Sequence, residues 1–223
     1  MLKKSFFQIF MMGMIAISFP SCHGILDDIY DMPQEDAKKE VGFIETDSEN
    51  HSGRIYIDAT SYTQWTYIDF DHQEIFVTNI DKDKGAELEA QPQSWQLALH
   101  RYDAKTNVGS VLETQYNSLS ELKNAGKLPE GTFVADIEGK VTTDMSGMME
   151  GNILYADSPI NMEIGKWLNV DTSEMPPIYT LSKKVYLLKT KEGKYAALYL
   201  SNYMNDALKK GFMTIDYIYP LEF

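Results

Sequence analysis

Short runs of alternating apolar and polar residues recur along most of the chain, and residues that favour turns separate them. A period of two is typical of strands that bury one face, and enrichment in Tyr, Ile, Val, Thr, Phe and Trp favours the same structure. The runs are Arg54–Asp58, Tyr62–Phe70, Glu74–Thr78, Trp95–Arg101, Thr132–Asp136, Lys184–Thr190, Lys194–Leu200 and Phe212–Tyr219. The pattern predicts a single, mainly β domain. Its clearest hairpin joins Val185–Thr190 to Tyr195–Leu200, with Gly193 supplying the positive φ of the turn.

Two short helices interrupt this pattern. The first has Ser118 and Glu121 as a capping pair and ends at Gly126, and the second is expected over Met162–Leu168 after an Asn161 cap. The long segment Lys140–Tyr179, which includes the second helix, has weak periodicity and many glycines and prolines. We therefore expect long loops there, at one end of the β domain, where binding residues are commonly found.

The first residues are typical of an exported lipoprotein. Lys3 and Lys4 precede an apolar stretch that is too short for a confident membrane span, so residues 1–21 are predicted to be a signal peptide. A small residue, Ser21, precedes Cys22, which is the predicted lipid anchor; the alternative is an incidental cysteine beside an ordinary cleavage site. Residues 22–52 are rich in Asp and Glu and are predicted to be a flexible tether, with one short pairing segment near Val41–Ile44. The β domain is expected over residues 53–223.

Charge and cysteine content narrow the classes of partner and site. After removal of the signal peptide the chain would carry 18 Lys and Arg against 33 Asp and Glu, a net charge of −15. Such a surface repels phosphate backbones, so nucleic acid is not an expected partner. The single cysteine excludes an intramolecular disulfide and a cysteine-rich metal site, and the only expected membrane contact is the lipid on Cys22.

Catalytic motifs are missing from the sequence, and we predict that the protein is not an enzyme. It has no nucleophile elbow, zinc-protease motif, phosphate-binding loop or dinucleotide fingerprint. Carboxylates are too numerous for one catalytic pair to stand out. The four histidines show no ligand spacing, and His100, within a predicted strand, is interpreted as a structural residue.

Methionines provide the most distinctive candidate chemistry. Met145, Met148 and Met149 crowd into one short stretch, and Met175 directly precedes Pro176 and Pro177, which restrict its backbone to an extended conformation. Thioether sulfur is a soft, neutral ligand that suits Cu(I) and haem iron. Methionine also fills irregular space in protein cores, so the pattern alone leaves both roles open.

Longer stretches around these methionines resemble the HmuY family of haem-binding lipoproteins. The similar stretches include Trp95–Asn107, Val111–Thr114, Met145–Gly151, Met175–Tyr179, Lys194–Asn205 and Gly211–Pro220. The resemblance covers about residues 54–222. It implies a hand-like β fold that grips haem between loops at one end. It also implies a surface-exposed outer-membrane lipoprotein, which can be released as a haemophore, takes haem from host haemoproteins and passes it to a TonB-dependent receptor.

The same resemblance implies which residues would hold the iron. The best-known family members use two histidines, whereas the corresponding stretches here carry methionines, as in a methionine-using branch. Met148 and Met175 are therefore the expected axial ligands, and Met145 and Met149 are alternative ligands or packing residues. Nearby candidates for contact with the macrocycle or its propionates are Tyr155, Trp167, Tyr179, Lys140 and Lys166; core burial is favoured for Trp167, and a solvated position for both lysines.

An acidic, aromatic-rich β domain is equally compatible with a second function. It could be a surface binding module without haem, such as an adhesin or a peptide- or glycan-binding lipoprotein. A haem titration separates the two hypotheses.

Overall fold

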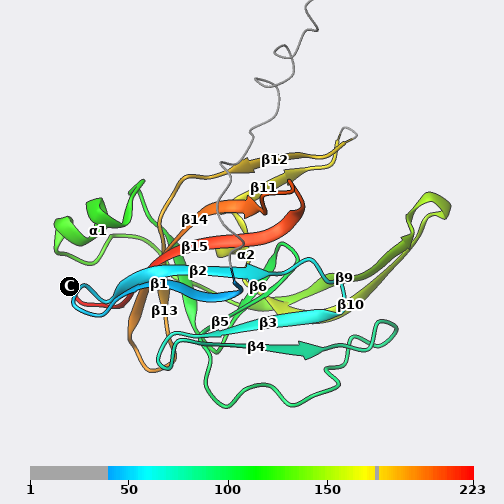
Figure 1. Cartoon of the computed structure of the whole chain (residues 1–223), viewed down its shortest axis with the longest axis horizontal. Coiled ribbons are helices and arrows are strands. Elements are labelled where there is room, and N and C mark those ends of the chain that lie inside the picture. The colour runs from blue at the N-terminus through cyan, green and yellow to red at the C-terminus, as the bar shows by residue number, and fades with distance from the viewer. Residues whose placement is uncertain (1–39, 174–175) are drawn as a thin grey trace, which may run out of the picture. The chain divides into compact units, whose positions relative to one another are not determined.

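Strands dominate the computed structural model, which describes residues 40–173 and 176–223. They form two larger sheets and two separate hairpins, and every pair of neighbouring strands is antiparallel (Figure 1). The prediction of a mainly β fold with two short helices is confirmed. No helix in the described part of the chain has the length and hydropathy needed to cross a bilayer.

The larger sheet has seven strands. Their order across the sheet is β1 (Gly42–Asp47), β2 (Ser52–Asp58), β15 (Lys210–Leu221), β14 (Tyr195–Met204), β13 (Tyr186–Lys189), β7 (Ser110–Glu113) and β8 (Val134–Ala135). The predicted hairpin is β13–β14, in which Lys189 pairs with Tyr195. Gly193 has a φ of 83° in its turn, as the sequence predicted.

The remaining strands form a four-stranded sheet and two hairpins. The sheet has the order β4 (Glu74–Asn79), β3 (Gln64–Asp69), β5 (Leu97–His100) and β6 (Asp103–Thr106). The hairpins pair β9 (Ile137–Gly147) with β10 (Asn152–Ile160) and β11 (Leu168–Asp171) with β12 (Ile178–Leu181). In Figure 1 both hairpins extend to the right, away from the C-terminus.

Two expectations about chain organisation need correction. The sheet begins at β1, inside the predicted tether 22–52, because Gly42–Asp47 pairs with β2 from Tyr56 back to Ser52. The expected pairing segment near Val41–Ile44 is therefore present and longer than predicted. The prediction of long loops over Lys140–Tyr179 is wrong, because most of this segment belongs to the two hairpins and to the short helix α2 (Met162–Gly165).

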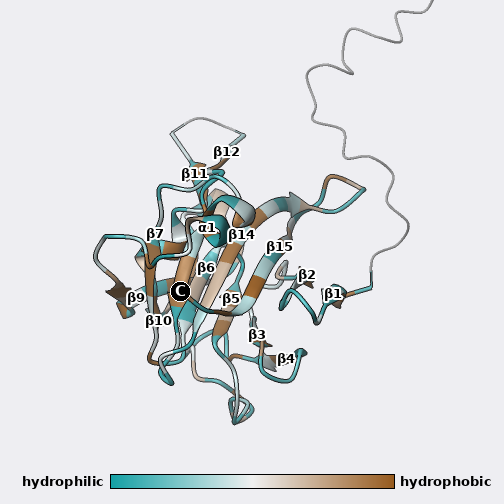
Figure 2. Cartoon of the chain, turned by 90° about the vertical axis from the view of Figure 1, so that its left-hand side faces the viewer, coloured by the Kyte–Doolittle hydropathy of each residue, from teal (hydrophilic) through white to brown (hydrophobic). Residues whose placement is uncertain are grey.

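The two larger sheets pack face to face, and strand alternation determines which side chains meet. Ile68 of β3 faces the seven-stranded sheet and contributes to a core with Ile55 and Leu198, whereas its neighbour Tyr67 points to the opposite face. Figure 2 shows hydrophobic residues concentrated on strands such as β5, β14 and β15. Trp167, which follows α2, is 1% exposed in the same core, so the expected burial of this side chain is confirmed.

Two further hydrophobic clusters lie on the outer faces of the two larger sheets. On the far face of the four-stranded sheet, Trp65, Tyr67 and Trp95 pack with Val141 and Ala156 of the β9–β10 hairpin. A third cluster packs the helix α1 (Leu119–Ala125) against the outer face of the seven-stranded sheet through its buried Leu122. The β9–β10 hairpin is thus fixed to the domain along its base.

The caps predicted for both helices are present. Ser118 accepts a hydrogen bond from the Glu121 amide at 3.2 Å, and Gly126 closes α1 in the left-handed conformation. At α2, the side-chain oxygen of Asn161 accepts hydrogen bonds from the amides of Glu163 and Ile164, each at 3.1 Å. The helix ends at Gly165, earlier than the predicted Leu168.

Replacement of Ser118 by Ala is expected to lower the free energy of unfolding by about 1 kcal/mol, because the Glu121 amide loses its acceptor. Chemical denaturation of Ser118→Ala measures the effect, with Asn124→Ala as the control variant. Asn124 is exposed on the same helix and caps nothing, so its replacement should cost no stability. Equal stability of Ser118→Ala and the original chain would show that the cap contributes nothing.

Candidate functional site

The β9–β10 hairpin carries all three methionines of the first predicted ligand stretch. Met145 lies near the end of β9, and Met148 and Met149 lie in a 3₁₀ helix (Met148–Glu150) at the tip. Met148 is 40% exposed and Met149 is 88% exposed, whereas Met145 is half-buried. The structure therefore places two thioethers at the hairpin surface instead of in the core.

Gly147, next to Met148, has an ordinary backbone conformation. Its φ is −93°, which any residue adopts, so it does not supply special backbone freedom beside Met148. A Cβ at this position would lie 2.6 Å from the Asn152 carbonyl oxygen, because the two strands approach closely at Gly147–Asn152. The left-handed residue is Gly151, with a φ of 77°, and it closes the tip.

Other large apolar side chains of the two hairpins are also open to solvent. Leu154 is 37% exposed and Tyr155 is 53% exposed on β10, and Ile178 is 51% exposed at the start of β12. Exposure of large apolar side chains costs free energy in water, and such residues often belong to surfaces that bind a ligand or a partner. Sequence analysis singled out Tyr155 but missed Leu154 and Ile178. If β10 and β12 had been predicted as strands, the alternation of their residues would have placed Leu154 and Ile178 on solvent-facing positions.

The second predicted ligand, Met175, lies outside the described residues. The strands on either side are described: Asp171 of β11 pairs with Ile178 of β12. Tyr179 lies in this hairpin, and its ring stacks on Tyr203 at 5.6 Å with an interplanar angle of 14°. Lys210 Nζ lies 4.0 Å from the centroid of the same ring. Tyr179 is thus already engaged by residues of the seven-stranded sheet.

The two lysine candidates are engaged by carboxylates. Lys140 forms an exposed ion pair with Asp157 at 3.2 Å, and Lys166 forms one with Glu163. The hydrogen bond that the Lys166 ammonium donates to the Glu163 carboxylate raises the pKa of Lys166, so this ammonium stays charged. Both lysines are solvent-exposed, in agreement with the prediction.

Histidines are not part of either described hairpin. His100 is fully buried, contacts the Tyr62 carbonyl oxygen through Nε2 at 2.8 Å and packs against Trp65, which agrees with its predicted structural role. His72 pairs with Asp69 at 2.7 Å, and this hydrogen bond raises the pKa of His72. Across residues 40–173 and 176–223 no group of three or more His, Cys, Asp or Glu is arranged to hold a metal ion. The soft donors at the tip of the β9–β10 hairpin are the thioethers of Met148 and Met149, next to the carboxylate of Glu150.

Part of the segment between β4 and β5 holds this hairpin in place. The Thr143 hydroxyl donates to the Lys82 carbonyl at 2.7 Å, and the Lys82 ammonium pairs with Asp144 at 3.4 Å. Gly85 lies so close to Ala156 that a Cβ there would overlap it. These contacts restrain the hairpin below Met145 and leave the tip open.

The fold and the site define a class: a mainly β domain that presents exposed thioethers and apolar side chains at the tip of a long hairpin. The family model described as HmuY protein matches residues 61–217. The chain belongs to the HmuY family. No curated protein matches it.

Solved structures of similar proteins support this membership. A protein of Bacteroides vulgatus, described as HmuY-like and haem-binding, is 55% identical, with a TM-score of 0.77, over 82% of this chain and 100% of that one. A protein of Bacteroides fragilis described as a lipoprotein is 53% identical, with a TM-score of 0.78, over 84% and 99% of the two chains. An apo HmuY analogue of Tannerella forsythia is 27% identical, with a TM-score of 0.61, over 74% and 94%.

Proposed function

We propose that this protein binds haem at its two hairpins, with the iron held between the thioethers of Met148 and Met175. The observation that carries the proposal is the exposure of Met148 at the tip of a hairpin in a member of the HmuY family. A relative of 55% identity is described as haem-binding, which supports the same cargo here.

The residues of the described hairpin fit haem as a ligand. Thioether sulfur is an established axial ligand of haem iron and prefers the softer ferrous state. The exposed Leu154 and Tyr155 offer apolar contact to a flat macrocycle on the same hairpin. Met145 and Met149 are the alternative ligands or packing residues, because flexible thioethers adapt to irregular surfaces.

The proposed setting is the cell surface. Cys22, which lies outside the described residues, would carry the lipid that anchors the mature chain in the outer membrane, and a similar protein is described as a lipoprotein. Tethered or released, the domain would act as a haemophore that takes haem from host haemoproteins and delivers it to a TonB-dependent outer-membrane receptor. The protein would therefore be a carrier, with no reaction of its own.

A haem titration of the mature chain tests the proposal. Aliquots of haem are added under oxidising conditions and again with dithionite, and the Soret band is followed in each series. We expect saturable binding in both, with tighter binding and a sharper six-coordinate spectrum for ferrous haem, because thioether ligation favours Fe(II). An unchanged spectrum in both redox states would remove haem binding and leave the second hypothesis, a surface module without haem.

A further inference from the structure

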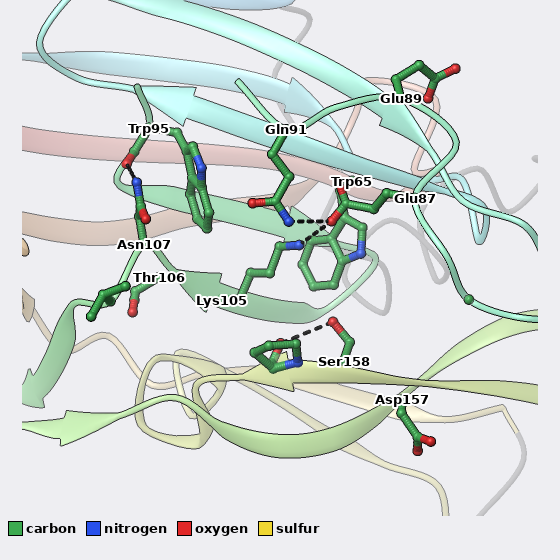
Figure 3. Close-up of a pocket in the computed structure, with 13 residues that line it drawn as sticks. Trp65, Glu87, Glu89, Gln91, Trp95, Lys105, Thr106, Asn107, Asp157 and Ser158 are labelled. Atoms are coloured by element: carbon green, nitrogen blue, oxygen red, sulfur yellow. Dashed lines mark hydrogen bonds and ion pairs between the residues drawn. The ribbon is translucent and has the colours of Figure 1, made fainter. Parts of the chain in front are cut away.

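A cavity of about 510 Å³ lies beside the base of the β9–β10 hairpin, separate from its tip. Trp65 of β3 and Lys105 of β6 contribute to it, and so do Glu87 and Gln91 between β4 and β5 and Ser158 of β10 (Figure 3). Its volume is within the range of small-molecule sites, and Met145, Met148 and Met149 are not among the described residues that line it.

A charged pair with a buried lysine lies at the inner end of this cavity. The side chain of Lys105 is 5% exposed, and its ammonium donates to the Glu87 carboxylate at 2.9 Å. The same ammonium lies 4.2 Å from the ring centroid of Trp65, 5.0 Å from that of Tyr67 and 5.8 Å from that of Trp95. Cation–π contacts with three rings hold the lysine in one position.

Glu87 and Gln91 form a fixed polar edge beside this pair. One oxygen of the Glu87 carboxylate accepts hydrogen bonds from the Tyr67 hydroxyl and the Gln91 amide, each at 2.7 Å. Burial raises the pKa of Glu87, but the hydrogen bonds from Lys105 and Tyr67 outweigh it and the pKa lies below its usual value. The carboxylate is therefore ionised near neutral pH.

The balance of charge around the cavity indicates which ligands fit. The carboxylates of Glu87, Glu89 and Asp157 line it, against two ammoniums: that of Lys105 in the lining and that of Lys140, which pairs with Asp157 from outside it. This excess of negative charge disfavours anions, including phosphates and carboxylic acids. The buried ammonium disfavours a second cation at the inner end. The remaining choice is an uncharged ligand.

The polar groups further indicate that this uncharged ligand is rich in hydroxyls. Trp65 and Trp95 are 2% and 6% exposed, so the indoles offer only narrow apolar strips to a ligand. Amide and hydroxyl groups of Gln91, Asn107 and Ser158 complete the lining. Such a mixture can both donate and accept hydrogen bonds at several points, as a sugar ring requires.

We propose that this cavity is a binding site for a neutral saccharide. The site is independent of the proposed haem site, because it uses the opposite end of the hairpin and different residues. Its occupant would contact Ser158 and Pro159 of β10 on one side and the segment after β4 on the other. A glycan held here would position the domain on a glycosylated surface.

The test uses four uncharged disaccharides with the haem-free mature chain: maltose, lactose, cellobiose and N,N′-diacetylchitobiose. Binding is followed by tryptophan fluorescence and by saturation-transfer difference NMR. Fluorescence is informative because two of the three tryptophans line the cavity. We expect saturable binding of at least one sugar with a dissociation constant of about 1 mM or tighter.

Gln91→Ala and Gln93→Ala locate the binding. Both glutamines are exposed, but only Gln91 lines the cavity. Loss of one hydrogen-bonding partner should weaken sugar binding about fivefold in Gln91→Ala, whereas Gln93→Ala should bind like the original chain. Haem titration of Gln91→Ala should be unchanged, which separates this site from the haem site.

Three outcomes would overturn the proposal. The first is the absence of saturation transfer and of a saturable fluorescence change with all four sugars. The second is equal sugar affinity in Gln91→Ala and the original chain. The third is a preference for the anionic 3′-sialyllactose or for the cation spermidine over every uncharged sugar.

Discussion

Replacement of Met175 by Ala is expected to weaken ferrous haem binding by about 10- to 100-fold or more and to convert a six-coordinate spectrum into a five-coordinate one. The proposed site supplies one thioether to each face of the iron, so the variant retains only the ligand from the other hairpin. Loss of a direct ligand should cost at least as much as loss of an outer-shell partner, which already costs 10- to 100-fold. Titration of ferrous haem, followed in the Soret region, measures both effects.

Variants of the other methionines complete this test. Met148→Ala should reproduce the loss seen in Met175→Ala, and Met145→Ala and Met149→Ala should have smaller effects. Met162→Ala is the matched control, because Met162 is 55% exposed but lies on α2 and not at a hairpin tip. If Met175→Ala kept the original spectrum and affinity, the assignment of Met175 would be wrong even though haem binds. A loss confined to Met145→Ala or Met149→Ala would reassign the first ligand.

The second large effect is expected for Glu87→Gln, which should lower the free energy of unfolding by about 3–5 kcal/mol. This change leaves the buried Lys105 ammonium without its counter-ion, and the neighbouring aromatic rings replace only part of the lost interaction. Urea denaturation at neutral pH measures the difference. The double variant Glu87→Gln with Lys105→Met should recover much of the loss, because it no longer contains a buried unpaired charge. A single variant as stable as the original chain would contradict this account.

The same ion pair predicts how stability depends on pH. The pKa of Glu87 is lower in the folded protein than its ordinary value of 4.5, so folding favours the ionised form. Its contribution is therefore fully present above about pH 4.5 and is lost as the pH falls through the lower, folded pKa. Glu87→Gln should remove this part of the acid dependence. Glu130→Gln, which changes an exposed carboxylate away from this pair, should leave it intact.

Strands that bury one face could be predicted from the sequence because their alternation is regular. In β3, β5 and β14, successive residues contribute to different hydrophobic clusters on opposite faces of the sheet. Tyr67 and Ile68 of β3 are an example. The same principle failed for β9 and β10. Each of these strands pairs only with the other, and few of their positions are buried, so the apolar pattern that marks a core strand is weak. Glycines such as Gly147 and Gly151 favour a loop in the sequence, but in the structure they lie at the tip of a hairpin.

The candidate sites differ in how far the sequence could predict them. The methionine cluster is visible as a short motif, since Met145, Met148 and Met149 are close together in the chain. The saccharide cavity has no such motif, because its lining extends from Trp65 to Pro159 and depends on the packing of β3, β6 and β10. Burial of Lys105 could not be predicted either. An isolated lysine in a short polar strand is normally solvated, and the Glu87 carboxylate together with the three surrounding aromatic rings makes the buried position of Lys105 favourable.

The placement of the C-terminus has a practical consequence for experiments on this protein. Phe223 follows β15, and the chain ends on the side of the sheets opposite to the direction in which the hairpins extend (Figure 1). A fluorophore, an affinity handle or a sensor surface joined there would stand clear of the methionine-bearing tip. The last residue is thus a suitable point for attaching the protein in a fixed orientation, for example to build a haem reporter.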